Sequence, residues 1–305
     1  MRVKIWAYIE LTKPGIVLGN LIAVTGGFLL GSGANVAWMK GSLVALGVSL
    51  VISSACAINN VVDRDIDAKM VRTQRRPTVR GVISARAAVV FATVTGLAGF
   101  ALVSAGTGRA LPTLLIAAGY MVYTGPYSLH LKRHSVHGTL AGSVAGAMPP
   151  VAGYCASAGR LDVACLVLFT TFTLWQLPHA YAIAIRREAD YRAARIPVLP
   201  LEKGMLATKR QMLLTVGAFG LAADSLGYFG YAGAIYEVTA VLAGIVWFLL
   251  AVRGFSARND VAWARTMFLS SVVVATALYG AMSIDGRRPT ESGNELHRPS
   301  VPLRG

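Results

Sequence analysis

The sequence predicts an all-α protein that crosses a membrane many times. Of its 305 residues, 55% are hydrophobic and only 14% are charged, whereas a soluble domain usually carries about 25% charged residues. Runs of about 20 mostly apolar residues, long enough to span a bilayer as helices, recur along the chain. Lipid offers no hydrogen-bonding partner to free backbone groups, so each run is expected to be a helix.

We expect about nine membrane-spanning helices in one bundle. Small residues and prolines lie within the apolar runs, where they allow close helix contacts or kinks. We expect residues 1–285 to form a single transmembrane domain and the polar residues 286–305 to form a disordered tail. The apolar runs cover residues 15–33, 41–61, 87–106, 110–128, 138–157, 162–184, 211–229, 231–252 and 266–284.

The positions of lysine and arginine predict the orientation of the bundle. Most of the 29 basic residues fall between spans on one side, and only Lys40, Arg109 and Arg160 fall in the connections on the other. Because positive charge accumulates on the cytoplasmic side, we expect an N-in, C-out bundle with long cytoplasmic loops at 62–86 and 185–210. The net charge of +15 then reflects the membrane topology and indicates contact with anionic lipid or an anionic substrate. It does not indicate a nucleic-acid partner.

The first loop begins with oxygen-bearing side chains at helical spacing. Asn59, Asp63 and Asp67 stand at i, i+4 and i+8, so a continuing helix would place them on one face. Hard divalent cations such as Mg²⁺ prefer such ligands and bridge them to substrate phosphates. Asp65 points away from this stripe and is interpreted as solvated or paired with a basic residue. The alternative, a charged helix end that marks the membrane boundary, is costly without a cation.

Basic residues near these carboxylates are candidates for binding a diphosphate. Arg72 and Arg76 follow the acidic stretch, and Lys132 lies in another cytoplasmic connection. A guanidinium group matches phosphate geometry with a planar pair of donors. The alternative for each of these residues is a positive charge that anchors its loop at the membrane surface.

The second loop carries a further carboxylate at a comparable depth. Asp190 follows the sixth span as Asp63 follows the second. Opposed carboxylates could hold metal ions from both sides of one diphosphate. Taken alone, Asp190 would be interpreted as a surface acid.

The remaining singled-out residues carry weaker signals. His179, near the end of the sixth span, could ligate iron, orient a substrate or be a hydrogen-bonded packing residue. Cys56, Cys155 and Cys165 have no metal-ligand spacing. Their odd number argues against a disulfide framework, and we interpret them as small buried hydrophobic residues.

Several of these stretches together resemble the UbiA superfamily of intramembrane prenyltransferases over roughly residues 5–285. The paired aspartate motifs carry that resemblance, and further stretches point to its heme-modifying branch. Many superfamily members have an aspartate where this chain has Ala194, and this departure supports the heme-modifying branch. The matching stretches are Thr12–Gly15, Asn60–Asp67 with Met70, Arg72–Thr73 and Arg76–Pro77, Lys132–Ser135, Pro149–Pro150, Trp175–His179, Asp190–Tyr191 and Ile196–Pro200.

The resemblance implies transfer of a farnesyl group from farnesyl diphosphate to the vinyl group of heme B, with addition of water. It implies a Mg²⁺ cofactor and a bacterial inner-membrane protein with its active site on the cytoplasmic side. The implied metal ligands are Asn59, Asp63, Asp67 and Asp190, and the implied catalytic residues are Asp63, Asp67, Asp190, Arg72, Arg76 and Lys132. The implied substrate-binding residues are Asn59, Asn60, Tyr127, Arg133, His179 and Tyr191.

Two other functions stay open at the level of the sequence. A related prenyltransferase that acts on an aromatic quinone precursor would share the metal site and differ in the acceptor pocket. A transporter would place ionisable residues near mid-membrane, whereas here the acids cluster at one face. The next enzyme of heme A synthesis and a terminal oxidase are conceivable partners, although no residue points to either.

Overall fold

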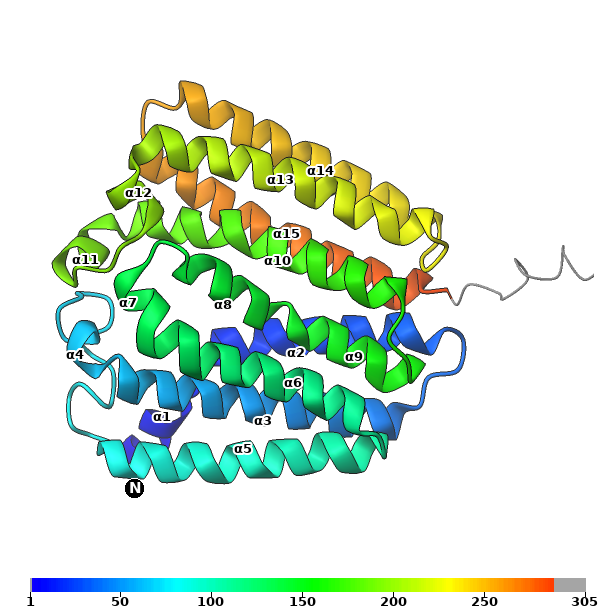
Figure 1. The fold of residues 1–305 in the computed structure, drawn as a ribbon, viewed down its shortest axis with the longest axis horizontal. Coiled ribbons are helices and arrows are strands. Elements are labelled where there is room, and N and C mark those ends of the chain that lie inside the picture. The colour runs from blue at the N-terminus through cyan, green and yellow to red at the C-terminus, as the bar shows by residue number, and fades with distance from the viewer. Residues whose placement is uncertain (1, 288–305) are drawn as a thin grey trace, which may run out of the picture.

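Long helices run side by side through the computed structural model, which describes residues 2–287 (Figure 1). The all-α fold predicted from the sequence is confirmed. In chain order the α-helices are α1 (Arg2–Leu11), α2 (Pro14–Ser32), α3 (Trp38–Val62), α4 (Arg64–Asp67), α5 (Ala85–Thr107), α6 (Ala110–Val122), α7 (Lys132–His134), α8 (Gly138–Gly146), α9 (Met148–Ala158), α10 (Val163–Arg186), α11 (Glu188–Ala193), α12 (Leu199–Glu202), α13 (Gly204–Tyr228), α14 (Ala234–Arg253) and α15 (Asp260–Asp285).

Within residues 2–287, six of the nine predicted spans are uninterrupted helices long and apolar enough to cross a bilayer. They are α2, α3, α5, α10, α14 with the 3₁₀ turn η2 (Gly254–Ser256), and α15. The run 110–128 instead begins as α6 and continues as a π-helix, η1 (Tyr123–Leu131). The run 138–157 is divided into α8 and α9, and α13 carries Lys209, Arg210 and Asp224. The predicted tail lies outside the described residues except for Gly286 and Arg287.

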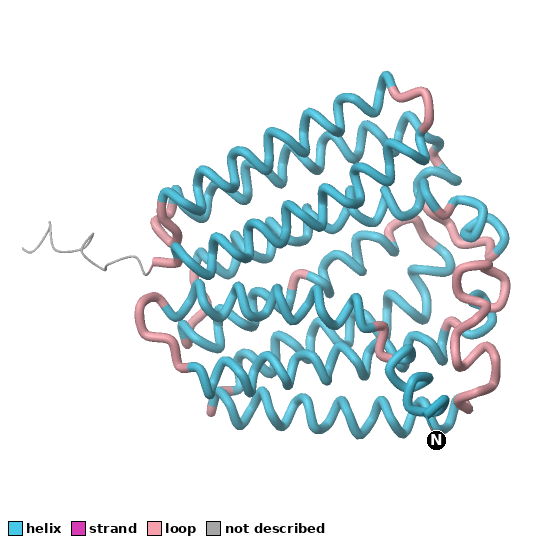
Figure 2. Tube along the Cα trace, turned by 180° about the vertical axis from the view of Figure 1, so that it is seen from behind, coloured by secondary structure: helices cyan, strands magenta, loops and turns pink. Residues whose placement is uncertain are grey.

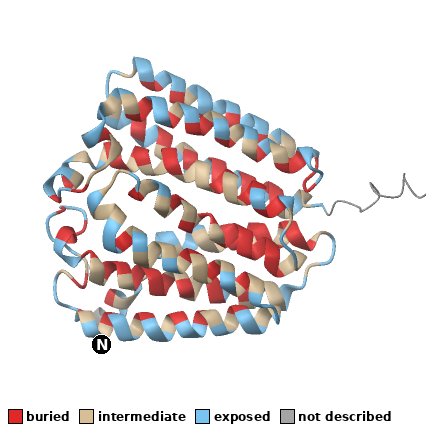
Figure 3. Ribbon diagram, viewed as in Figure 1, coloured by how far each residue is buried: buried red, intermediate tan, exposed pale blue. Residues whose placement is uncertain are grey.

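The outer surface of the bundle is apolar, as a lipid-facing surface must be. Large hydrophobic side chains on the outermost helices are exposed, among them Leu97 on α5 and Leu242 on α14. Figure 3 shows the exposed positions along α5 and α14, with buried residues concentrated on the helices between them. In water such a surface would be a large hydrophobic patch, which soluble monomers avoid. The protein is therefore a multi-pass membrane protein.

Small residues bring α2 and α9 into close contact. A Cβ atom on Gly27 would lie 2.0 Å from the Pro150 carbonyl oxygen, and one on Gly153 would lie 2.1 Å from that of Val24. Only glycine permits this approach of two helix backbones. The contact fixes α9 against α2.

The connections at the two ends of the bundle differ in length. Figure 2 shows the loops gathered at the ends, with the longer ones at the end that also holds α1. At that end lie α4, α7, α11 and α12 (Figure 1), so both long charged loops predicted from the sequence share one end of the bundle. The last described residues lie at the opposite end.

Candidate active site

The end of α3 carries the first group of predicted site residues. Asn59 and Asn60 lie in its last turn, and Asp63 is the residue at which the helix ends. The backbone N–H groups of Asp63 and Asp67 still donate to carbonyl oxygens four residues earlier, at 2.9 and 2.8 Å. Helical hydrogen bonding therefore passes through Asp63, although the helix is divided there into α3 and α4.

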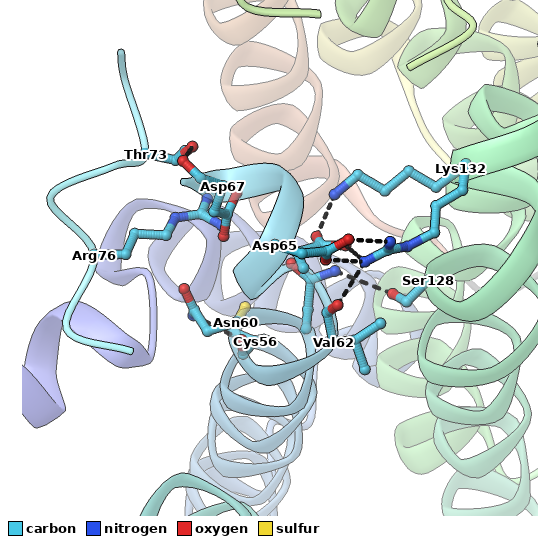
Figure 4. Close-up of polar contacts among 12 residues, drawn as sticks. Cys56, Asn60, Val62, Asp65, Asp67, Thr73, Arg76, Ser128 and Lys132 are labelled. Atoms are coloured by element: carbon cyan, nitrogen blue, oxygen red, sulfur yellow. Dashed lines mark hydrogen bonds and ion pairs between the residues drawn. The ribbon is translucent and has the colours of Figure 1, made fainter. Parts of the chain in front are cut away.

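Asp63 and Asp67 are almost fully buried carboxylates, and each pairs with a cation. Lys132 of α7 donates to Asp63 Oδ2, and Arg76 donates to Asp67 Oδ2. Figure 4 shows Arg76 with Asp67 on one side of the end of α3 and Lys132 on the other. A buried charge is tolerated when it is paired in this way, so the acidic stretch is more than an exposed boundary of the membrane.

Each of these carboxylates also has one buried oxygen without a hydrogen bond, namely Asp63 Oδ1 and Asp67 Oδ1. The nearest cation recorded for Asp63 Oδ1 is Arg133 Nη2, at 4.0 Å. A buried acceptor that lacks a partner is costly and typically marks a site for another ligand. The hard anionic oxygens of Asp63 and Asp67 fit a divalent cation such as Mg²⁺.

Asn59 is held by two neighbours from different parts of the chain. Its Nδ2 donates to Ser128 Oγ at 3.1 Å, and its Oδ1 accepts from Lys13. Asn60, in contrast, uses its amide to bind the carbonyl oxygens of Leu11 and Cys56, at 3.0 and 2.8 Å. Asn60 therefore joins α1 to α3, and its amide is not turned towards the cavity.

Arg133 forms a clamp across the end of α3. It donates to both carboxylate oxygens of Asp65, at 2.7 and 2.8 Å, and to the Val62 carbonyl oxygen at 2.6 Å (Figure 4). These hydrogen bonds lower the pKa of the Asp65 carboxyl group to about 2. The interpretation of Asp65 as solvated or paired with a basic residue is confirmed, because its side chain is 61% exposed and paired with Arg133.

The two long loops meet at the same end of the bundle. Asp190 Oδ1 accepts from the Val71 backbone N–H at 2.9 Å, which joins the second loop to the first. A small hydrophobic cluster also links them: Ile66 and Met70 come from the first loop, and Ala194 and Ile196 come from the second. Tyr191 and Val198 pack against this cluster.

The metal ligands predicted from the sequence are only partly brought together. In the part of the chain that the structure describes, no three His, Cys, Asp or Glu side chains converge as a metal-binding group. Asp63 is the residue at which α3 ends, and Asp67 is the last residue of the short helix α4. Glu188, two residues before Asp190, pairs with Arg192. Arg72, which was predicted to bind the diphosphate, is exposed. The four-residue metal set stays a prediction.

A cavity of about 780 Å³ lies in the bundle beside this polar end. Its volume falls within the range of about 300–1,000 Å³ that is common for small-molecule sites. Lys132 lines it and also contacts Asp63, so the cavity borders the carboxylate cluster. Its aromatic lining residues include Tyr127, Trp175, Tyr191, Phe268 and Tyr279.

The π-helix η1 shapes the polar end of this cavity. It contains Pro126, which cannot donate a backbone hydrogen bond, and Ser128 Oγ donates to the Tyr123 carbonyl oxygen at 2.7 Å. The rings of Tyr123 and Tyr127 stack at 5.2 Å and both line the cavity. Such π-helical segments often occur at functional sites.

His179 lies in the cavity wall at the middle of an aromatic stack. Its ring is 4.8 Å from the Trp175 ring and 4.9 Å from the Phe268 ring. The Ser271 hydroxyl donates to the Phe268 carbonyl oxygen at 2.6 Å, so its oxygen accepts from His179 Nδ1 at 2.7 Å. A neutral His179 with its proton on Nδ1 keeps the lone pair of Nε2 available.

Lys13 is a residue of this site to which sequence reasoning gave no role. It precedes α2 with φ of +53°, a left-handed conformation that is uncommon outside glycine. Burial lowers the pKa of its ammonium group to about 8, and Arg76 and Lys132 nearby act in the same direction. It lies within the matching stretch Thr12–Gly15, and the signal available in the sequence was its place directly before Pro14.

Comparison with known proteins identifies the family of this chain. The model of the UbiA prenyltransferase family matches residues 20–272. Protoheme IX farnesyltransferase 2 of Chromobacterium violaceum is 48% identical over 290 residues, covering 95% of this chain and 96% of the relative. The protoheme IX farnesyltransferase of Klebsiella pneumoniae is 49% identical over 278 residues, covering 91% and 94%.

Solved structures share the fold at low sequence identity. A digeranylgeranylglyceryl phosphate synthase is 16% identical with a TM-score of 0.76, covering 93% of this chain and 98% of that one. A UbiA homologue from Archaeoglobus fulgidus bound to GPP and Mg²⁺ is 15% identical with a TM-score of 0.66, covering 91% and 100%. The family model and the relatives point to the same family, and the helical bundle has that fold. The chain belongs to the UbiA prenyltransferase family.

Proposed function

We propose that this protein transfers the farnesyl group of farnesyl diphosphate to the vinyl group of heme B, with addition of water, to form heme O and diphosphate. One observation carries the proposal: an aromatic cavity of about 780 Å³ meets a buried cluster of carboxylates and cations at Lys132. An apolar prenyl chain suits the first environment and a diphosphate suits the second. Relatives that are 48–49% identical are named protoheme IX farnesyltransferases, which supports heme B as the acceptor.

The cations at the polar end bind the diphosphate. Lys13, Arg76 and Lys132 each pair with an oxygen of Asn59, Asp67 or Asp63, so they surround the place where the carboxylates lie. Arg72, on the same loop as Arg76, contributes from the exposed side. Cationic donors stabilise the negative charge that grows on a departing diphosphate.

Asp63 and Asp67 would hold Mg²⁺ through the carboxylate oxygens that have no hydrogen bond, and Asn59 and Asp190 are the further proposed ligands. Bound Mg²⁺ would supply electrostatic stabilisation of the leaving diphosphate. Asp190 reaches the first loop through the Val71 N–H, which places the second loop against the site.

The reaction needs no nucleophilic side chain. The bond between farnesyl C1 and the diphosphate oxygen breaks, and the electron pair leaves with the diphosphate. The vinyl π electrons form the new carbon–carbon bond to C1, and water adds to the resulting cation with loss of a proton. Tyr127 and Tyr191 both line the cavity. They keep other water from the allylic carbon before transfer.

His179 binds the heme acceptor in this scheme. The hydrogen bond from Nδ1 to Ser271 fixes the ring, and metal-ligating histidines almost always donate a hydrogen bond through their other nitrogen in this way. The neighbouring Trp175 and Phe268 rings give a flat porphyrin an aromatic surface. We therefore propose Nε2 of His179 as the iron-contacting atom.

Spectroscopy of bound heme tests the role of His179 without turnover. Ferric heme B is titrated into the purified protein and the Soret band is recorded for the wild type and for His179→Ala. Loss of the wild-type band position in His179→Ala, with recovery on addition of imidazole, supports ligation. An identical band in both proteins rules it out. No heme binding by folded wild type counts against the heme acceptor itself.

Acceptor competition tests the proposed reaction. The protein in detergent receives farnesyl diphosphate, Mg²⁺ and equal amounts of heme B and an aromatic quinone precursor, and products are identified by mass spectrometry. Farnesylated, hydrated heme as the main product supports the proposal. A prenylated aromatic product in its place would assign the chain to the quinone branch of the same family.

We place the protein in the bacterial inner membrane, with residues 1–285 as one transmembrane domain and the active site on the cytoplasmic side. The lysine and arginine pattern supports this orientation. The site end also holds both loops that are rich in basic residues, which suits a diphosphate that is made in water and a prenyl chain that resides in lipid.

A further inference from the structure

Two of the three cysteines are in contact at the end of the bundle opposite the candidate active site. Cys155 belongs to the last turns of α9 and Cys165 to the first turn of α10. Their Sγ atoms are 3.3 Å apart, and both residues are buried. The connection between these helices lies at the same end as the last described residues (Figure 1).

The connection between the two helices holds the sulfur atoms in place. Asp162 caps α10 by accepting from the Ala164 N–H at 3.1 Å. Its other oxygen accepts from the Tyr154 hydroxyl at 2.8 Å and from Arg160 Nε at 2.9 Å. Asp162 thus joins the end of α9 to the start of α10 beside the sulfurs. The contact is built by the fold, because the chain spacing of the two cysteines alone does not require it.

We propose that Cys155 and Cys165 form a disulfide that joins α9 to α10. A disulfide is about 2.0 Å long, so the sulfurs need only a small closing movement. This end is the side that the basic residues assign to the outside of the membrane. In bacteria that side is oxidising, and disulfides persist there.

The chemistry is an exchange with a disulfide-bearing oxidant of that compartment. One Cys155 or Cys165 thiolate attacks the oxidant, and the second thiolate displaces it from the mixed disulfide. The S–S bond of the oxidant breaks, the Cys155–Cys165 bond forms, and two protons and two electrons pass to the oxidant. Since both sulfurs are buried in the folded bundle, exchange occurs before α9 and α10 have packed fully.

The disulfide fixes two walls of the cavity relative to each other. Pro149 on α9 and His179 on α10 both line it. A covalent link at the outer ends of these helices limits their sliding, while the site at the inner end stays free of the redox chemistry. Cys56, on α3 in the other half of the bundle, has no cysteine partner among residues 2–287.

Mass analysis tests the disulfide directly. The full chain is expressed in a bacterial membrane, purified without reductant in the presence of an alkylating agent, denatured and digested. We expect alkylation of Cys56 alone and a Cys155–Cys165 peptide pair that separates after reduction, with a gain of the mass of two hydrogen atoms. Alkylation of all three cysteines in the unreduced protein would overturn the proposal.

Variants separate the disulfide from simple packing of the thiols. Cys155→Ser, Cys165→Ser and the double variant are compared with Cys56→Ser by thermal unfolding in detergent, with and without reductant. We expect reductant to lower the thermal midpoint of the wild type and of Cys56→Ser. The midpoints of Cys155→Ser, Cys165→Ser and the double variant should not change with reductant. Equal midpoints with and without reductant for folded wild type would contradict the link.

Discussion

At the scale of single residues, the candidate site consists of buried carboxylates and of side chains that reach them from distant parts of the chain. Asp63, Asp67 and Asp190 lie at one end of the bundle, buried as a functional site requires. Lys13 contacts Asn59 from 46 positions away, and Lys132 contacts Asp63 from 69 positions away. Helical spacing predicts neighbours along one helix, whereas contacts across the bundle depend on how the helices pack. For that reason sequence reasoning gave Lys13 no role and did not predict that the Asn60 amide binds the carbonyl oxygens of Leu11 and Cys56.

Lys13 provides the first residue-scale prediction. Lys13→Gln removes a cation from the proposed diphosphate site, and a hydrogen bond to a charged group contributes about 1.5–3 kcal/mol. We expect the KM for farnesyl diphosphate to rise between about ten- and a hundredfold, and Lys13→Arg to recover most of it. Steady-state kinetics with each substrate varied in turn provides the measurement. An unchanged KM for farnesyl diphosphate, or an equal rise in the KM for heme B, would count against this role.

At the scale of elements, the sequence predicted the spans and missed their interruptions. The apolar runs at 110–128 and 138–157 correspond to α6 with η1 and to α8 with α9. Hydropathy records that a segment is apolar, but not whether its backbone follows one helical geometry throughout. Pro126 and the Pro149–Pro150 pair were visible signals. Whether a proline kinks, caps or starts a helix depends on the conformation of the backbone around it.

The contact between α2 and α9 gives a prediction at this scale. Gly153→Ala places a methyl group 2.1 Å from the Val24 carbonyl oxygen, so the helices must separate. Overpacking of this kind costs about 1–3 kcal/mol. We expect a lower thermal midpoint in detergent, with Gly280→Ala as the control, because a Cβ atom there meets nothing within 4 Å. Equal midpoints for the two variants would show that α9 can move away from α2 without cost.

At the scale of the whole molecule, composition and charge predicted the architecture. An apolar surface with exposed residues such as Leu97 and Leu242 is the result of a chain with 14% charged residues. The meeting of the two loops was also expected, because both follow spans that end on the same side. The hydrogen bond from Val71 to Asp190 and the cluster around Ile66 and Ile196 join them by contacts that no sequence spacing encodes.

Topology mapping tests the orientation of the whole bundle. We expect alkaline phosphatase fused after residue 285 to be active, because the positive-inside pattern places this end outside. The same reporter fused within the loop 185–210 should be inactive, and a fluorescent protein fused there should be bright. The reverse pattern would place the proposed site outside and would require a different source of farnesyl diphosphate.

The most direct test of the proposed site compares two aspartates that lie two positions apart. Asp63 is buried with one unpartnered oxygen, whereas Asp65 is exposed and paired with Arg133. Release of diphosphate is measured with heme B, farnesyl diphosphate and Mg²⁺ for the wild type, Asp63→Asn and Asp65→Asn, each with a chelator control. We predict that Asp63→Asn and the chelator lower turnover by roughly a hundredfold or more, while Asp65→Asn stays within about threefold of the wild type. Full turnover by folded Asp63→Asn would contradict a catalytic centre at the end of α3.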